Sequence, residues 1–203
     1  LFSYEAAKKL GGKFILRIED IDSQRSSKVF EESIYEDLEW LQIKYSKDIR
    51  HQDEHMDDYK GAIKELQKLD MVYPCFCSRS DIKAEIMRAG NAPHEEEASI
   101  YPGTCRRLSK EEQIEKISTE TSFAWRLNIR AAAKKLGNLV WSDLRLGKHT
   151  VPVGTMGDVV LARKDVPTSY HLSATLDDHI QKIGLVTRGE DLVSATHVHK
   201  IIQ

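Results

Sequence analysis

Apolar residues along the chain occur either at helical spacing or in short continuous runs that end in charge. Residues 1–10 are rich in Ala, Lys and Leu and lead into Gly11-Gly12, which is how a helix commonly ends. Residues 13–18 form a short, mostly apolar run, typical of a strand that is buried on both faces. A helix, a glycine turn and a buried strand in this order indicate an α/β fold.

Two amphipathic helices are predicted next, each from apolar residues that recur every three or four positions. The first stripe consists of Phe30, Ile34, Leu38 and Leu41, and the second of Tyr59, Ile63, Leu66 and Leu69. Both stripes are most simply interpreted as faces that pack into a core.

The character of the sequence changes at Tyr73, where Cys, Pro, Gly and small residues become frequent. Residues 89–103 indicate an irregular loop. Alternating apolar residues at 123–129, and the stretches 139–151 and 159–163, favour strands. We therefore predict a mixed subdomain with antiparallel pairing that begins near Tyr73.

The last part of the chain is predicted to return to the α/β pattern. Residues 183–187 indicate a second short buried strand that ends in charges, and a helix is expected at 195–202. In open parallel sheets, ligands bind beyond the carboxyl ends of the strands. Glu19 and Arg188, which follow the two predicted strands, can therefore converge on one crevice.

A carboxylate and a guanidinium that face one crevice suit a small zwitterion. Glu19 can accept hydrogen bonds from an ammonium group, and Arg188 can donate two parallel bonds to a carboxylate. The Tyr170 hydroxyl can close such a pocket. The alternative interpretation is that the charges are strand ends that meet solvent, with a surface ion pair such as Arg17 with Asp20, and that Tyr170 is a packing residue.

The cysteines suggest a metal. Cys75 and Cys77 are one residue apart, and Cys105 follows Tyr101 by four positions. Thiolates bind zinc well, and a tetrahedral site can stabilise a segment that has little core of its own. The fourth ligand is left open between Tyr101, a His such as His94, and water, and three unligated cysteines are the alternative.

Composition narrows the class of protein. Of the 203 residues, 40% are hydrophobic and 31% are charged, and no apolar run is long enough to cross a bilayer, so no membrane partner is expected. The chain starts at Leu1 without a basic-then-apolar leader, so we expect a cytoplasmic protein. A net charge of −2 argues against a broadly basic surface, although a local basic groove remains compatible with it.

Four phrases of the sequence resemble class I glutamyl-tRNA synthetases and occur in the same order as in that family. They are residues 12–22, 73–79, 101–106 and 187–191, which together span nearly the whole chain. Four phrases in one order are far more specific than any single phrase.

Within that family, the sequence resembles the shortened branch, the glutamyl-Q tRNA(Asp) synthetases, through residues 165–172, 177–181 and 195–199. The longer synthetases usually carry an Asn-Thr-Pro-Arg-Gln-like phrase where this chain has residues 194–198. The sequence departs from the branch at Lys182, where Gly is common. Arg107 stands where some longer synthetases have a zinc-binding His, which shifts the expected fourth ligand to Tyr101.

The resemblance implies a fold in three parts. Residues 1–72 and 166–203 would form the Rossmann-type parallel sheet of a class I aminoacyl-tRNA synthetase catalytic domain. Residues 73–165 would form a mixed α/β insertion that bears zinc.

The resemblance also implies an activity: ATP-dependent activation of L-glutamate, followed by its transfer to the queuosine base of tRNA(Asp), with charging of tRNA(Glu) as the alternative. ATP would act as co-substrate with Mg²⁺, and its signatures are expected outside residues 1–203. Carried over by motif, Glu19, Tyr170 and Arg188 would bind glutamate, and Cys75, Cys77, Tyr101 and Cys105 would bind Zn²⁺. No residue is assigned a catalytic role, because attack of a carboxylate on a phosphate depends on positioning and charge stabilisation.

Overall fold

The structure, a computed structural model, describes residues 1–22, 26–88, 101–119 and 122–203. The first part of the chain contains one small parallel sheet and three helices. These elements are α1 (Phe2–Lys9), β1 (Arg17–Ile18), α2 (Lys28–Trp40), β2 (Arg50–His51), the 3₁₀ turn η1 (Asp53–His55) and α3 (Met56–Lys68). Strands β1 and β2 pair in parallel, which confirms the α/β class expected for this part.

The middle of the chain is built on antiparallel pairing, as predicted. Its elements are β3 (Val72–Cys75), α4 (Arg79–Arg88), η2 (Thr104–Arg107), α5 (Lys110–Thr119), β4 (Ala124–Leu127), α6 (Ile129–Leu136), β5 (Val140–Asp143), β6 (Gly147–Thr150) and β7 (Val160–Arg163). One sheet has the strand order β3-β4-β7, and β5 and β6 form a separate hairpin. The predicted loop at 89–103 lies mostly outside the described residues, and the boundaries at 73 and 165 remain predictions.

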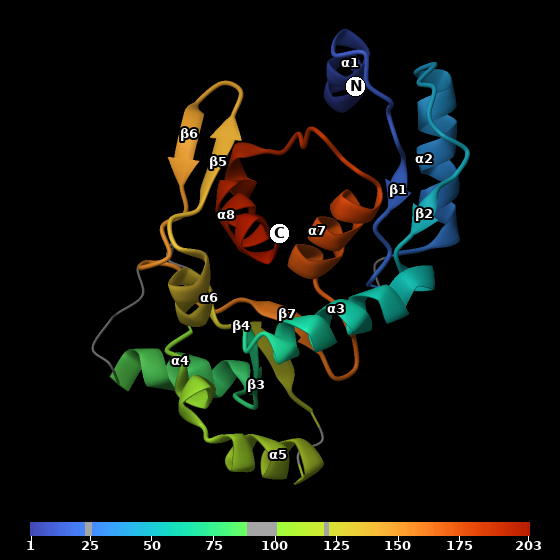
Figure 1. Cartoon of the computed structure of the whole chain (residues 1–203). Coiled ribbons are helices and arrows are strands. Elements are labelled where there is room, and N and C mark those ends of the chain that lie inside the picture. Colours follow the sequence, from blue (N-terminus) through green and yellow to red (C-terminus); the bar gives the residue numbers. More distant parts are fainter. Residues whose placement is uncertain (23–25, 89–100, 120–121) are drawn as a thin grey trace.

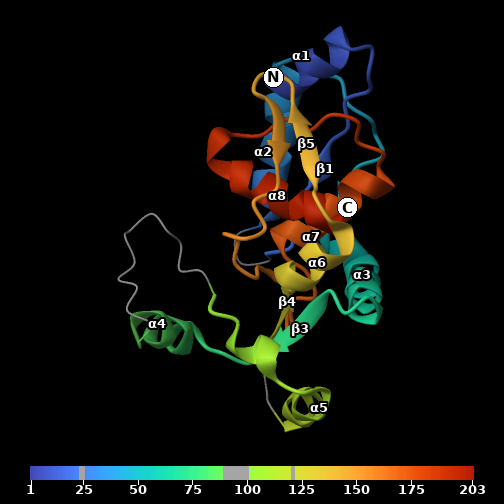
Figure 2. The same cartoon turned by 60° about the vertical axis from the view of Figure 1, so that its left-hand side comes forward.

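Two helices complete the chain, α7 (Tyr170–Ile180) and α8 (Val193–Ile202), with the turn η3 (Glu190–Leu192) before α8. Figure 1 shows α7 and α8 in the centre, between the β5–β6 hairpin on one side and β1, β2 and α2 on the other. Figure 2 shows α4 and α5 at the end of the molecule opposite α1, so the Cys-bearing region lies far from the parallel strands.

Local sequence explains several element boundaries. Ser27 caps α2, with its hydroxyl accepting a hydrogen bond from the Phe30 N–H. Asn128 caps α6 in the same way, through the Ala131 N–H. Helix α6 ends at Gly137, whose φ of 66° favours glycine.

The main core lies between α3, the β3-β4-β7 sheet, α7 and α8. Side chains with almost no exposed surface meet there from α3, β4, α6, β7 and α7, namely Tyr59, Leu127, Ile129, Leu161 and Leu172. Helix α8 adds Val198 and Ile201. The apolar stripe of α3 was therefore predicted correctly at Tyr59 and Ile63, whereas Leu69 at the end of the helix is 48% exposed.

The predicted core face of α2 is wrong. Phe30 is 63% exposed and Ile34 is 40% exposed, and no residue of α2 is buried. Helix α2 lies beside β1 and β2, which have only two residues each and therefore present little apolar surface for it to cover.

The two predicted buried strands are also largely wrong within the described residues. Only Arg17 and Ile18 of residues 13–18 are in a ladder, and residues 183–187 form no strand. Leu185 and Val186 are 37% and 50% exposed. Both segments line the same cavity, so side chains that were expected to be buried in a sheet border open space instead.

No helix in the described part of the chain combines the length and apolar character that crossing a membrane requires.

Candidate functional site

A cavity of about 1020 Å³ lies between α1, residues 12–17, α7 and residues 183–189. Glu19, Tyr170 and Arg188, the three residues expected to bind glutamate, all line it. They come from the end of β1, the start of α7 and the segment before α8. The structure therefore brings together in one cavity three side chains that are up to 169 positions apart in the sequence, from residue 19 to residue 188.

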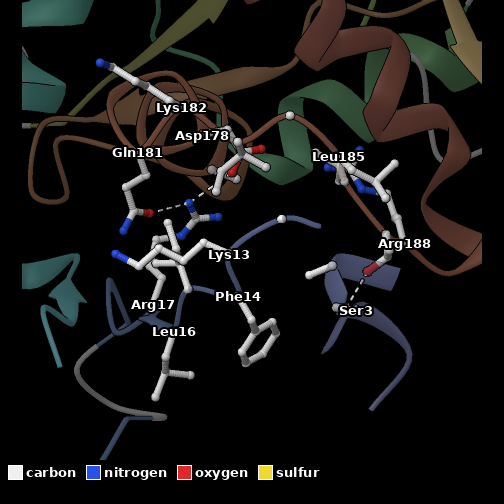
Figure 3. Close-up of a pocket in the computed structure, with 18 of the residues that line it drawn as sticks. Ser3, Lys13, Phe14, Leu16, Arg17, Asp178, Gln181, Lys182, Leu185 and Arg188 are labelled. Carbon is white, nitrogen blue, oxygen red and sulfur yellow. Dashed lines mark hydrogen bonds and ion pairs between the residues drawn. The ribbon is translucent and has the colours of Figure 1, made fainter. Parts of the chain in front are cut away.

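Glu19 is held at the cavity wall by Arg17. The Arg17 guanidinium lies 3.1 Å from Glu19 Oε1, and its other side donates to Asp178 at 3.0 Å and to the Gln181 side chain at 3.1 Å. Figure 3 shows the Arg17 guanidinium directed toward Gln181 and Asp178. Burial opposes the charge, but Asp178 and Glu19 outweigh it and raise the pKa of Arg17. Arg17 is thus paired with Glu19 and Asp178, whereas the alternative interpretation named Asp20 as its partner.

Asp177, which precedes Asp178 on α7, fixes the Glu19 side of the cavity to neighbouring elements. Its side chain is completely buried and accepts hydrogen bonds from Arg50 Nε at 2.8 Å, Gln52 Nε2 at 2.8 Å and the Tyr59 hydroxyl at 2.9 Å. Arg17 Nε is 4.0 Å away. The Asp177-Asp178 pair lies inside α7 and connects that helix to β1, β2 and α3.

Arg188 is oriented by α8 on the opposite wall. It donates to the Thr196 hydroxyl at 2.8 Å and to His199 Nδ1 at 2.9 Å. Burial, followed by the Arg188 and His171 charges, lowers the pKa of His199 to about 3, so this ring is neutral at ordinary pH. The α1 helix is joined to the same segment through Ser3, whose hydroxyl lies 2.5 Å from that of Thr187.

The cavity offers complementary charges to a small zwitterion. Glu19 presents a carboxylate whose side chain is 43% exposed, and half-buried Arg188 presents a guanidinium. Asp178 and Gln181 line the same wall as Glu19, and all three side chains contact Arg17. Of the two carboxylates, Glu19 is the more exposed, at 43% against 15% for Asp178, so it has the more surface free for a ligand.

The four expected zinc ligands lie together at the far end of the molecule. The sulfur atoms of Cys75, Cys77 and Cys105 all lie within 4.8 Å of one another. Cys77 Sγ is 3.5 Å from Cys105 Sγ and 3.6 Å from the Tyr101 hydroxyl. His94, the other named candidate for the fourth ligand, lies outside the described residues.

This donor set fits a tetrahedral zinc ion. Zinc–sulfur bonds of about 2.3 Å place two ligand sulfurs roughly 3.8 Å apart, close to the separation between Cys77 and Cys105. A hydrogen bond from Cys75 lowers the pKa of Cys105 to about 6, which favours the thiolate that a metal requires. The Arg126 guanidinium lies 4.0 Å from the centre of the Tyr101 ring, so a positive charge already neighbours the cluster.

Two buried carboxylates were missed by the sequence analysis. Asp158 is 3% exposed and accepts hydrogen bonds from the Tyr73 hydroxyl, Arg106 and the Ile129 N–H. Asp177 anchors the cavity as described above. For Asp177 a signal existed, because it lies on the buried face of α7 with Ser173 and Ala174, where an unpaired carboxylate would be unfavourable.

Comparison with known proteins shows the family to which the chain belongs. Residues 1–203 match the family described as tRNA synthetases class I (E and Q), catalytic domain. A glutamyl-Q tRNA(Asp) synthetase from Rhodobacter capsulatus is 37% identical over 100% of this chain and 74% of its own length. A glutamate–tRNA ligase from Hydrogenobaculum sp. is 39% identical over 97% of this chain, which spans only 40% of that relative.

A solved structure has the same fold. The glutamate–tRNA ligase from Elizabethkingia meningosepticum, crystallised in complex with its amino acid, superposes with a TM-score of 0.80 at 29% identity. The match covers 98% of this chain and 41% of that one. By these matches, the chain belongs to the family of class I tRNA synthetase catalytic domains for glutamate and glutamine.

Proposed function

We propose that this protein activates L-glutamate with ATP and transfers it to the queuosine base of tRNA(Asp). The observation that carries the proposal is the presence of Glu19, Tyr170 and Arg188 on the walls of one cavity. Glu19 would accept hydrogen bonds from the α-ammonium group, Arg188 would bind a carboxylate of glutamate, and Tyr170 would close the site with its hydroxyl.

The chemistry proposed for this site needs no protein base. A carboxylate of glutamate attacks the α-phosphate of ATP and pyrophosphate leaves, giving glutamyl-adenylate, and the acceptor nucleophile then displaces AMP. Both steps depend on alignment and on stabilisation of phosphate charge, to which Mg²⁺ on ATP would contribute. The role of residues 1–203 in this scheme is to bind and orient the amino acid.

The choice of acceptor separates two activities. The match to the Rhodobacter capsulatus protein, over 74% of its length, favours queuosine in tRNA(Asp). The match to the Hydrogenobaculum ligase, at 39% identity, favours the alternative of charging tRNA(Glu). Relatives of both names match over nearly the whole chain, so the acceptor has to be tested directly.

The test incubates the full-length protein with ATP and labelled glutamate and one of three tRNAs: queuosine-containing tRNA(Asp), tRNA(Asp) without queuosine, or tRNA(Glu). We expect label only on the first, in the anticodon fragment after nuclease cleavage. Label confined to the 3′ end of tRNA(Glu) would establish the alternative, and no glutamate-dependent label on any tRNA would overturn both.

A variant connects this activity to the cavity. Arg188→Ala removes charge-assisted hydrogen bonds of about 1.5–3 kcal/mol, so the KM for glutamate should rise by roughly 10- to 150-fold. Arg130→Ala is the matched control, because Arg130 is exposed on α6 and does not line the cavity. Equal glutamate KM values for the two variants would contradict a substrate role for Arg188.

We further propose that Cys75, Cys77, Tyr101 and Cys105 bind one structural Zn²⁺. The ion would cross-link the end of β3 to Tyr101 and η2, and stabilise a segment whose own apolar cluster is small. Elemental analysis of protein purified without added metal should find about one zinc per chain, and Cys105→Ser should lose it. Protein that is folded at residues 72–108 and contains almost no zinc would reject the site.

A further inference from the structure

A chain of three side chains leads from the cavity into the core between α7 and α8. Arg188 donates to Nδ1 of His199 at 2.9 Å, and Nε2 of His199 lies 3.3 Å from Nδ1 of His171. His199 is 5% exposed, so its ring has little access to water. Neither histidine lines the cavity, so both can act on a ligand there only through lining residues that they contact, and Arg188 is the one to which His199 is hydrogen-bonded.

The proton positions in this chain follow from the chemistry of its members. A guanidinium can only donate hydrogen bonds, so Nδ1 of His199 must be an unprotonated acceptor. Neutral His199 then carries its proton on Nε2 and donates to Nδ1 of His171. His171, in turn, carries its proton on Nε2. Each ring is thereby confined to one tautomer and one orientation.

The hydrogen-bond partners of Arg188 are neutral, so they do not offset its positive charge. Arg17 pairs with Glu19 and Asp178, and Arg50 pairs with Asp58 and Asp177. The described residues include no carboxylate ion-paired with Arg188, which is held instead by the neutral side chains of Thr196 and His199. A guanidinium that is fixed by neutral acceptors keeps its full attraction for an anionic ligand.

We propose that His199, supported by His171, is a positioning residue that orients the Arg188 guanidinium toward the carboxylate of the amino-acid substrate. This inference rests on the proposed function, because it assigns Arg188 to glutamate. Thr196 fixes one nitrogen of the guanidinium and His199 fixes the second, and together they set the plane of the group. The Tyr170 ring, centred 5.3 Å from that of His199, packs on the same histidine.

The test compares two substitutions of one residue. His199→Gln keeps one acceptor and one donor in the side chain, so the KM for glutamate should stay within about threefold of the wild-type value. His199→Leu fills the space but accepts nothing, so the KM for glutamate should rise roughly tenfold, the effect of one lost hydrogen bond. In both variants kcat and the KM for ATP should be unchanged.

Two further variants provide a control and a second, independent test. His179→Leu is the matched control, because His179 is exposed on α7 and does not line the cavity, and it should behave as wild type. His171→Leu should raise the glutamate KM by about threefold, since it loosens His199 without removing the acceptor. This variant also provides the measurement if His199→Leu does not fold.

Three results would overturn the inference. They are a wild-type glutamate KM in His199→Leu, an equal defect in His199→Gln and His199→Leu, or losses in kcat and in the KM for ATP that match the loss for glutamate. Failure of the wild-type protein to use glutamate would instead reject the proposed function itself, so the two failures are distinguishable.

Discussion

The buried carboxylate of Asp177 joins three elements of the fold through its hydrogen bonds. Three side chains donate to it, from β2, from the residue after β2 and from α3, and its own side chain has no exposed surface. Paired and fully hydrogen-bonded, such a charge is compatible with burial, whereas removal of one partner leaves the others without compensation. Burial and the Asp177 charge also raise the pKa of Tyr59, which keeps this hydroxyl protonated as a donor.

Asp177→Asn should therefore destabilise the fold strongly. The amide cannot accept all the donors, and Arg50 loses a buried counter-charge, so the free energy of unfolding should fall by about 3–5 kcal/mol. Urea denaturation followed by circular dichroism measures this change. Asp57→Asn is the control, because its side chain is 94% exposed in a surface pair with Lys60, and it should leave the free energy of unfolding nearly unchanged.

The lowered pKa of His199 should make the free energy of unfolding depend on pH. Burial, Arg188 and His171 lower its folded-state pKa to about 3 from the ordinary value of 6.5. Between these values the unfolded chain binds more protons than the folded one, so stability is complete above about pH 6.5 and is lost as the pH falls toward 3. Arg188, His171 and Tyr170 are the groups that face this ring.

His199→Gln removes the titrating ring, so its unfolding free energy should fall less steeply between pH 6.5 and 4.5 than that of the wild type. Denaturation midpoints at several pH values measure the slope. Parallel curves for the two proteins would show that His199 does not titrate in this way.

Individual site residues differed in how far the sequence could predict them. Glu19 and Arg188 directly follow apolar runs, and this placed them in advance at the end of predicted strands, although the family phrases were needed to assign them to glutamate. The interaction of Asp177 with Arg50 spans 127 positions, and no local pattern indicates a partner at that distance. His199 and Arg188 are only 11 positions apart, but no sequence pattern shows that the His199 ring reaches Arg188, because the packing of α8 directs it there.

At the scale of elements, the end of α7 contains a strained residue. Lys182 has a φ of 55°, in the left-handed region that favours glycine, while the Lys182 and Ile183 N–H groups cap the helix carbonyls of His179 and Asp178. The departure noted from the sequence, Lys where related proteins commonly have Gly, thus falls on a position where a Cβ is unfavourable.

Lys182→Gly should consequently raise the unfolding free energy by about 1 kcal/mol, because it relieves the left-handed strain. Lys182→Ala is the matched comparison, since it removes the long side chain but keeps the Cβ, and it should give no gain. Thermal melts of the two variants test this, and equal melting temperatures would contradict the strain argument.

The helices were predicted better than the strands, for a physical reason. A helix satisfies its backbone within one segment, so the apolar spacing in α3 and α8 is sufficient to locate it. A strand requires a partner, and residues 183–187 have the composition of a strand but no ladder among the described residues. Antiparallel pairing in the middle of the chain was predictable because its strands are several and alternate with polar residues.

On the scale of the whole molecule, two apolar clusters are joined by one short strand. Val72 belongs to the main core, while Tyr73 and Cys75 belong to the smaller cluster with Tyr101 and Cys105. Strand β3 and its pairing with β4 connect the two. Loss of order in the smaller cluster need not therefore disrupt the main core.

Chelation should make this independence measurable. If zinc holds the smaller cluster, a strong chelator should raise amide exchange at residues 73–77 and 101–108, while α3, α7 and α8 keep their protection. Hydrogen–deuterium exchange with mass spectrometry resolves these segments. Uniform loss of protection across both clusters would show that they form one cooperative unit.

The contacts of Asp177 also have a consequence for the order of folding. They join residues separated by 118 to 127 positions, so closing them restricts a long stretch of chain. Such non-local contacts are expected to form after the folding transition state, when the elements between them are already compact. Asp177→Asn should then accelerate unfolding and leave the folding rate nearly unchanged. Asp177 would thus govern how long the native state persists, and hardly how fast it is reached.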